Sequence, residues 1–188
     1  MQTRSAQTRQ ALIRAAAELI ADGGPSDAGL VSICRRAGVS RGALYHHFSS
    51  TAQLMAAVYE QAHERVMELA EKAFDQRSAD GPERFLTALT RALREEELLR
   101  AGIQLSADGS PGPPQLRDEV LTLVRRHVSK GHRETAPSPD DLADLAVVVA
   151  AGLESLGHTD PAWWEAGTNQ RLWALLRPLF GAEAERIG

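Results

Sequence analysis

The chain has 188 residues, which is enough to bury one core of ordinary size or two smaller ones. Apolar residues make up 43% of it and charged residues 24%, proportions that are typical of globular proteins and exclude an intrinsically disordered or fibrous chain. The net charge of -4 is unevenly spread, because residues 1–50 contain six Arg and three acidic residues, whereas the remainder contains 15 basic and 22 acidic residues. We therefore expect positive potential at the N-terminal end, although a charge of this size is also compatible with an ordinary solvated surface.

The N-terminal region predicts three helices in close succession. Apolar residues recur at helical spacing over 5–22, and a Gly-Gly-Pro run then ends that helix. A second helix is expected over 30–37, and it ends at Gly38 because glycine tolerates the left-handed backbone of a tight turn. Ser40 is a favourable N-cap, so a short third helix should run over 41–47.

The rest of the chain also reads as helices. A long connector helix is predicted over about 52–76, because its apolar residues fall on one stripe. Two later helices are marked by a capping residue followed by proline, at Ser138-Pro139 and Asp160-Pro161. The further elements expected are a helix from 82 that continues past Leu98, a Gly- and Pro-rich loop at 106–114, and helices at 115–130, 139–156 and 161–180. No segment alternates convincingly as a strand would, so the predicted fold is all-α with about nine helices.

Export and membrane insertion are not expected. The longest apolar run, 145–153, has nine residues, whereas a membrane-spanning helix needs about twenty. The charged N-terminus leads into an amphipathic segment and not into the apolar centre of a signal peptide. The single cysteine, Cys34, cannot form an internal disulfide and is expected to be a small buried apolar group. We expect a cytoplasmic protein with no membrane partner.

The segment from Ile33 to Phe48 carries the functional signal, and it reads I-C-R-R-A-G-V-S-R-G-A-L-Y-H-H-F. It predicts helix, four-residue turn and helix, with apolar residues between the two helices and the other face of the second helix free. A helix-turn-helix inserts the N-terminal part of its second helix into the DNA major groove. The sequence therefore predicts binding to double-stranded DNA.

This stretch resembles the TetR family of transcriptional regulators, whose members show T-R in the first helix, then I-A-x-x-A-G-V-S-x-G-x-L-Y-x-H-F and S-K-x-x-L. The resemblance covers about residues 5–55, and the matching residues are Thr8, Arg9, Ile33, Ala37, Gly38, Val39, Ser40, Gly42, Leu44, Tyr45, His47, Phe48, Ser50 and Leu54. It implies a three-helix helix-turn-helix domain at 1–50 and a helical effector-binding and dimerisation domain at 51–188, with 51–76 as the connector helix.

The resemblance also implies which side chains contact DNA. Four residues would face the bases, namely Arg41, Gly42, Ala43 and His46. Three would bind the phosphates, namely Ser40, Tyr45 and His47, and Arg36 and Thr51 complete the expected set of DNA-binding residues. Arg41 is the main candidate for specificity, because a guanidinium can pair with guanine for about 1–3 kcal/mol of discrimination. The alternatives are a phosphate contact or a solvated charge for Arg41, and local packing for Tyr45 and His47.

Two positions depart from the family pattern. Ala28-Gly29 stands where the family usually has a Thr or Ser that caps the second helix and touches a phosphate, and Thr51 stands where the family usually has Lys. Each lost phosphate contact should make binding less dependent on salt. Either the affinity for DNA is lower than usual, or Arg4, Arg9 and Arg36 compensate. A metal site at His46 and His47 is not expected, because adjacent helical residues diverge by about 100°.

For the C-terminal part the resemblance implies a homodimer formed by the segments 139–156 and 161–180, and a pocket enclosed by the helices from 82 to 130. The expected dimer residues are Val148, Leu153, Leu156, Trp173 and Leu176, and the alternative for these segments is burial inside a single subunit. The expected pocket residues are Phe85, Leu89, Leu93, Ile103, Leu105, Leu123, Val124 and His127, and the alternative for each is ordinary core packing. The effector would be a largely hydrophobic small molecule, and no cofactor is expected.

These expectations combine into a repressor that binds a palindromic operator as a homodimer and is released by a small-molecule effector. Effector binding would shift the connector helix and change the separation of the two recognition helices from the roughly 34–36 Å that matches one DNA turn. One alternative is a DNA-binding protein without an effector, either architectural or acting as an activator. An enzyme is the other, and against it the chain shows no nucleophile elbow, phosphate loop or paired metal ligands.

Overall fold

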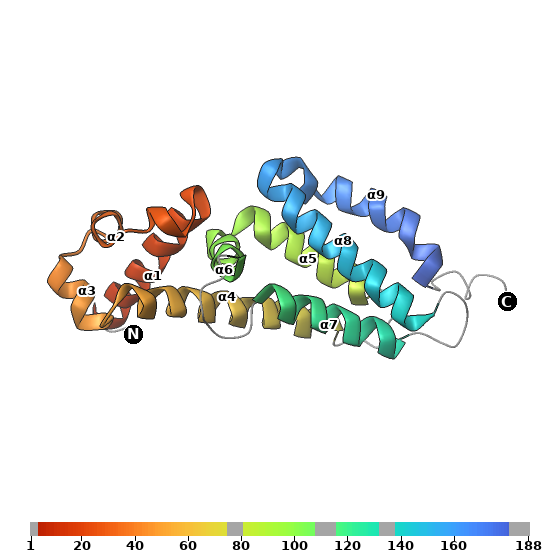
Figure 1. Ribbon diagram of the computed structural model, residues 1–188, viewed down its shortest axis with the longest axis horizontal. Coiled ribbons are helices and arrows are strands. Elements are labelled where there is room, and N and C mark those ends of the chain that lie inside the picture. Colours follow the sequence, from red (N-terminus) through yellow and green to blue (C-terminus); the bar gives the residue numbers. More distant parts are fainter. Residues whose placement is uncertain (1–3, 75–80, 108–115, 132–137, 181–188) are drawn as a thin grey trace. The chain divides into compact units, whose positions relative to one another are not determined.

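The computed structural model describes residues 4–74, 81–107, 116–131 and 138–180, and in these ranges every regular element is a helix. The chain divides into two compact units, an N-terminal unit of Met1–Arg65 with Glu96–Arg117 and a C-terminal unit of Val66–Glu95 with Asp118–Gly188. The α-helices are α1 (Arg4–Gly23), α2 (Leu30–Ala37), α3 (Arg41–His47), α4 (Thr51–Phe74), α5 (Gly81–Glu95), α6 (Glu97–Ala107), α7 (Leu116–Gly131), α8 (Pro139–Thr159) and α9 (Ala166–Leu176) (Figure 1). Three 3-10 helices complete the set: η1 (Pro25–Asp27), η2 (Pro161–Trp164) and η3 (Arg177–Phe180). The all-α prediction is confirmed.

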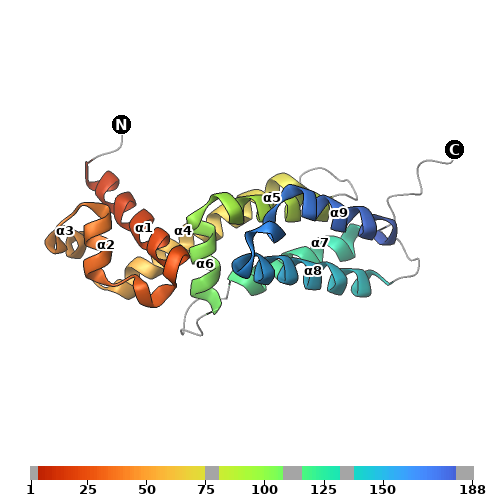
Figure 2. The same cartoon turned by 90° about the horizontal axis from the view of Figure 1, so that it is seen from above.

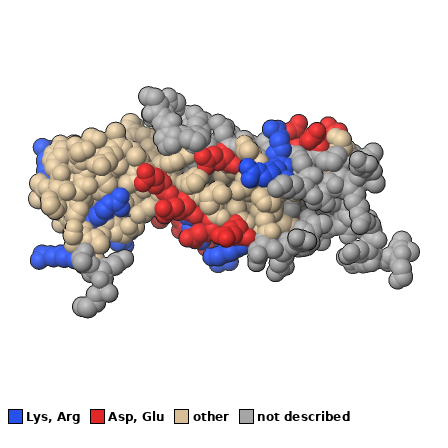
Figure 3. Space-filling model, turned by 90° about the horizontal axis from the view of Figure 1, so that it is seen from below, with Lys and Arg blue, Asp and Glu red and all other residues tan. Residues whose placement is uncertain are grey.

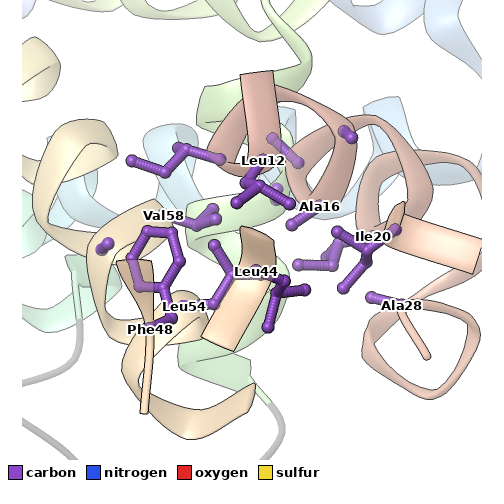
Figure 4. Packing of buried hydrophobic residues seen from close by; sticks show 14 of the residues in the cluster. Leu12, Ala16, Ile20, Ala28, Leu44, Phe48, Leu54 and Val58 are labelled. Atoms are coloured by element: carbon purple, nitrogen blue, oxygen red, sulfur yellow. The ribbon is translucent and has the colours of Figure 1, made fainter. Parts of the chain in front are cut away.

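The core of the N-terminal unit forms where α1 packs against α2, α3 and α6. Figure 4 shows side chains of α1, Leu12 and Ile20 among them, gathered with Leu44 of α3 and with residues of α4. Phe48, which follows α3, is 1% exposed and closes one side of this cluster. Burial of a large apolar side chain contributes about 1.5–3 kcal/mol, so this cluster fixes the positions of the short helices α2 and α3.

The boundaries of the first three helices agree with the sequence prediction to within one residue. Gly38 ends α2 with φ 67°, in the left-handed region that was expected of it. Cys34 is buried and free, as predicted. Local signals were sufficient here because each helix has its own stop or cap in the sequence.

In the C-terminal unit, α5 packs against α8, α9 and η2 (Figure 2). Trp164 of η2 is buried, and its indole Nε1 donates a hydrogen bond to the carbonyl oxygen of Leu153 at 3.0 Å. At the end of α4 the ring of Phe74 stacks on that of His127, with centroids 3.8 Å apart, and packs against Phe85 at 5.6 Å. The unit is therefore held by apolar and aromatic contacts between segments far apart in sequence.

Two of the predicted C-terminal helices were wrong in extent. The helix expected to continue past Leu98 ends at Glu95, and α6 begins at Glu97. The helix expected over 161–180 is divided into η2, α9 and η3, and Glu165 adopts an extended backbone (φ -67°, ψ 140°) that separates η2 from α9. Neither break contains a glycine at the point of interruption, so the usual stop signal was missing from the sequence.

Smaller differences concern the ends of other segments. Helix α4 is described as far as Phe74, and its predicted end at 76 lies outside the described residues, whereas α8 continues to Thr159 instead of ending near 156. The loop predicted at 106–114 is helical at its first two positions, which belong to α6, and its remainder lies outside the described residues. None of the described helices is both long enough and apolar enough to cross a membrane.

Candidate nucleic-acid interface

The turn between α2 and α3 is built by backbone bonds and one side-chain cap. The backbone N–H of Gly38 donates to the carbonyl oxygen of Arg35 at 3.3 Å, and that of Val39 donates to the carbonyl oxygen of Cys34 at 3.0 Å. Ser40 has an extended backbone, and its Oγ accepts a hydrogen bond from the N–H of Ala43 at 3.1 Å. Because an N-cap satisfies a backbone donor of the first turn, Ser40 fixes where α3 begins.

Helix α3 has one buried face and one free face. Leu44 is 1% exposed within the core of the N-terminal unit. On the other side Arg41, Gly42 and His46 are exposed, and 54% of Tyr45 is accessible. Ala43 and His47 are half-buried at the edge between the two faces. The residues that were expected to face the bases are thus on or beside the solvent side of the helix, and their contacts with DNA stay a prediction.

Arg36, which was expected to contact a phosphate, lies at the end of α2 and pairs with Glu18 of α1. Its Nη1 is 3.1 Å from Glu18 Oε2, and both side chains are partly exposed. By contrast Arg35 and Arg41 are exposed and have no ion-pair partner within the ranges that the structure describes. A phosphate would have to compete with Glu18 for Arg36, so Arg35 and Arg41 are the more available cations near the turn.

The start of α4 is fixed by two hydrogen bonds of Gln53. Ser50 Oγ accepts from the backbone N–H of Gln53 at 3.2 Å, and Gln53 Oε1 accepts from the backbone N–H of Ser49 at 2.6 Å. The pair resembles a capping box, except that Gln53 bonds Ser49 and not the N-cap residue Ser50, and the spacing S-x-x-Q in the sequence could have revealed it. Thr51, the first residue of the helix, is half-buried. Gln53 was missing from the predicted set although it sets the position of Thr51.

Helix α1 contributes two contacts that the sequence analysis missed. The guanidinium of Arg9 lies over the ring of Phe48, 5.2 Å from its centroid, which is within the range of a cation–π interaction. The side-chain amides of Gln10 and Gln61 exchange two hydrogen bonds of 3.1 Å and so join α1 to α4. Arg9 is therefore held beside the end of α3.

The departure from the family pattern at Ala28-Gly29 has a visible consequence. Gly29 is the N-cap residue of α2 and offers no side-chain oxygen to the first turn, and Ala28 is buried at 3% exposure.

On the face seen in Figure 3, basic side chains at the end nearer the N-terminus stand apart from one another, and acidic side chains form a run across the middle. On this face the positive charge is therefore carried by separate basic side chains and not by one continuous patch.

The helix-turn-helix matches a known protein family. Residues 12–58, from the middle of α1 into α4, match the model of the family described as bacterial regulatory proteins, tetR family. The helix-turn-helix of this chain is of the tetR family. The match includes the whole of α2, the glycine turn and α3, which are the elements whose geometry is described above.

Individual tetR-type proteins resemble this chain over most of its length. The A-factor receptor protein of Streptomyces griseus is 30% identical over 164 residues, which is 85% of this chain but 58% of the receptor. A solved structure of a gamma-butyrolactone receptor (ArpA-like protein) is 25% identical, with a TM-score of 0.70 over 95% of this chain and 98% of that one. CprB of Streptomyces coelicolor, solved with its biological operator sequence, is 25% identical, with a TM-score of 0.75 over 94% of this chain and 88% of that one.

The residues predicted to line an effector pocket fall in both units. Phe85, Leu89, Leu93 and Val124 are buried in the C-terminal unit, where Leu123 and His127 are half-buried. Ile103 and Leu105 lie on α6 and belong to the N-terminal unit, and Leu105 packs against its core. The structure thus brings six of the eight predicted residues into one unit.

The residues predicted for a dimer interface differ in exposure. Val148 is 66% exposed and Leu156 is 42% exposed, whereas Leu153 and Trp173 are buried inside the chain itself. Leu176 is half-buried. Two further large apolar side chains nearby are exposed, Leu175 at 75% and Leu179 of η3 at 42%. The sequence signal for these two was weak, because the helix boundary near Leu176 was not predicted.

Proposed function

We propose that this chain is a transcriptional repressor that binds a palindromic operator as a homodimer and dissociates from it when a small-molecule effector binds. The observation that carries the proposal is the free face of α3, with Arg41 and Tyr45 exposed beside a serine-capped turn. This is the arrangement that allows a recognition helix to enter a major groove. The cytoplasmic location expected from the sequence belongs to the same proposal.

The relatives support both halves of the proposal. CprB was solved with its operator, and its fold covers 94% of this chain. The A-factor receptor and the gamma-butyrolactone receptor are named for small molecules that they receive, and each resembles this chain well beyond the helix-turn-helix. We infer that the C-terminal unit of this chain also receives a small molecule, with a γ-butyrolactone as the first class to try.

The test begins with selection of bound fragments from random DNA by the unaltered chain, to define an operator. Arg41→Ala should weaken binding to that operator by about 1–3 kcal/mol while it leaves binding to unrelated DNA almost unchanged, because Arg41 reads a base. Tyr45→Phe, which removes only a hydroxyl, should weaken binding to both DNAs about equally, because Tyr45 binds a phosphate. Both are measured by fluorescence anisotropy at a fixed salt concentration.

The matched control is Arg91→Ala, which removes the same charge from an exposed position of α5 in the other unit. It should leave binding to both DNAs unchanged. Circular dichroism of each variant checks that the helices are retained. Operator binding that is unaffected by both Arg41→Ala and Tyr45→Phe would show that α3 is not the reading helix.

A further inference from the structure

Polar side chains are rare in the interior of the described chain. Within the described ranges only two of them are buried, Thr90 of α5 at 4% exposure and Asn169 of α9 at 0%. Both belong to the C-terminal unit, and they contact each other: Asn169 Nδ2 donates to Thr90 Oγ1 at 2.9 Å. Thr87 lies on the same side of α5, with its Oγ1 3.4 Å from the same nitrogen. Asn169, Thr90 and Thr87 are therefore a single polar spot, which we call the Asn169 cluster.

The hydrogen bonds of the Asn169 cluster have a definite direction. Thr90 Oγ1 donates to the carbonyl oxygen of Leu86 at 2.8 Å, so it acts as an acceptor toward Asn169. The amide nitrogen of Asn169 consequently faces the two threonines. Its Oδ1 is buried and accepts no hydrogen bond from any residue that the structure describes. A buried acceptor without a donor has lost the hydrogen bonds that water would supply, which makes it unfavourable unless another group donates to it.

The surroundings of the cluster define the chemistry of such a donor. Leu86 and Leu93, one turn to either side of Thr90 on α5, are at most 1% exposed, and Trp173 one turn beyond Asn169 on α9 is 3% exposed. An ionised carboxylate has no proton to donate and would be repelled by Oδ1, and a free ammonium ion would be costly to desolvate among these side chains. A neutral apolar molecule with one hydroxyl or N–H group satisfies both conditions.

We propose that Asn169 Oδ1 is the polar anchor of the effector site and accepts a hydrogen bond from a hydroxyl or N–H group of a neutral, largely apolar effector. This inference rests on the proposed function, since it assumes that the C-terminal unit binds a small molecule. Thr90 positions the amide, and Thr87 offers a second hydroxyl to the same ligand. The site selects among apolar molecules by the presence of a single donor.

The test uses two probes that differ only in a donor, 5-hexyl-γ-butyrolactone and 5-(1-hydroxyhexyl)-γ-butyrolactone, titrated into the full chain by calorimetry. The unaltered protein should bind the hydroxylated lactone about tenfold more tightly, which is the value of one good buried hydrogen bond. Asn169→Leu should bind the two lactones equally. Its neighbour Gln170 is exposed, so Gln170→Leu is the matched control and should keep the preference.

The thermal stability of the Asn169→Leu variant distinguishes an amide that binds a ligand from one that only stabilises the fold. Asn169→Leu removes an acceptor without a donor but also removes the Nδ2 donor that bonds Thr90, and these two effects oppose each other, so its Tm should stay close to that of Gln170→Leu. A Tm of Asn169→Leu well below that of Gln170→Leu would overturn the proposal. Equal affinity of the unaltered protein for the two lactones would also overturn it, and this result needs no variant. If the unaltered protein bound neither lactone, the γ-butyrolactone class suggested under the proposed function would fail, and the anchor with it.

Discussion

Gly38 controls the angle between α2 and α3 through its backbone alone. Its φ of 67° lies in the left-handed region, and an added Cβ would have no heavy atom within 4 Å. The cost of a side chain at this position is therefore conformational and not steric. Among the described residues only glycines have positive φ, which shows that the chain reserves this conformation for Gly24 and Gly38.

Gly38→Ala should lower the free energy of unfolding by about 1–2 kcal/mol, the cost of placing an L-residue with a Cβ in the left-handed region. Gly38→Asn should cost less, because asparagine tolerates this region. Gly167→Ala is the control: Gly167 lies in α9 with open space around its Cβ position, so alanine there should be neutral or stabilising. Urea unfolding followed by circular dichroism measures all three. Equal losses for Ala and Asn at position 38 would contradict a backbone origin.

At the scale of elements, the sequence predicted well where each helix has its own signal and poorly where a distant residue decides. The ends of α2 and α3 follow from Gly38 and Ser40, which are local signals. The start of α6 does not, because Glu96 is held by Arg65, 31 residues earlier in the chain. The free face of α3 could be predicted from its own residues. The burial of Trp173 could not, because it depends on how α9 packs against helices that are distant in sequence.

The Arg65–Glu96 pair should stabilise the junction between α4 and α6. The guanidinium makes three hydrogen bonds to the carboxylate, of 2.8, 3.0 and 3.2 Å, and each side chain is 32% exposed. A double-mutant cycle of Arg65→Met and Glu96→Gln should give a coupling of about 1 kcal/mol, since the geometry is bidentate and exposure is partial. The same cycle on Arg91 and Glu95, a more exposed pair within one helix in which Glu95 also bonds Arg94, should give a smaller coupling. Equal couplings would mean that the junction is held by apolar packing alone.

At the scale of the whole molecule, the C-terminal unit leaves large apolar side chains in solvent. Val148 of α8 is 66% exposed and Leu175 of α9 is 75% exposed, and Leu156 and Leu179 are each 42% exposed. Single exposed apolar residues are ordinary, but several on two consecutive helices favour a partner surface. A second copy of the chain fits the proposed function, because an isologous dimer presents two identical recognition helices to the two halves of a palindrome.

Sedimentation equilibrium at micromolar concentration should therefore give a mass of twice 20.4 kDa for the unaltered chain. Val148→Glu combined with Leu175→Glu should give 20.4 kDa, because each dimer would have to bury unpaired carboxylates. The control is Val31→Glu, which changes an apolar side chain of α2 that is 58% exposed and should leave the dimer intact. A monomer can occupy one half-site only, so the double variant should also protect half of the operator footprint with much lower affinity. A monomeric unaltered chain that still protected a full palindrome would separate operator binding from the C-terminal helices and contradict their role as the dimer interface.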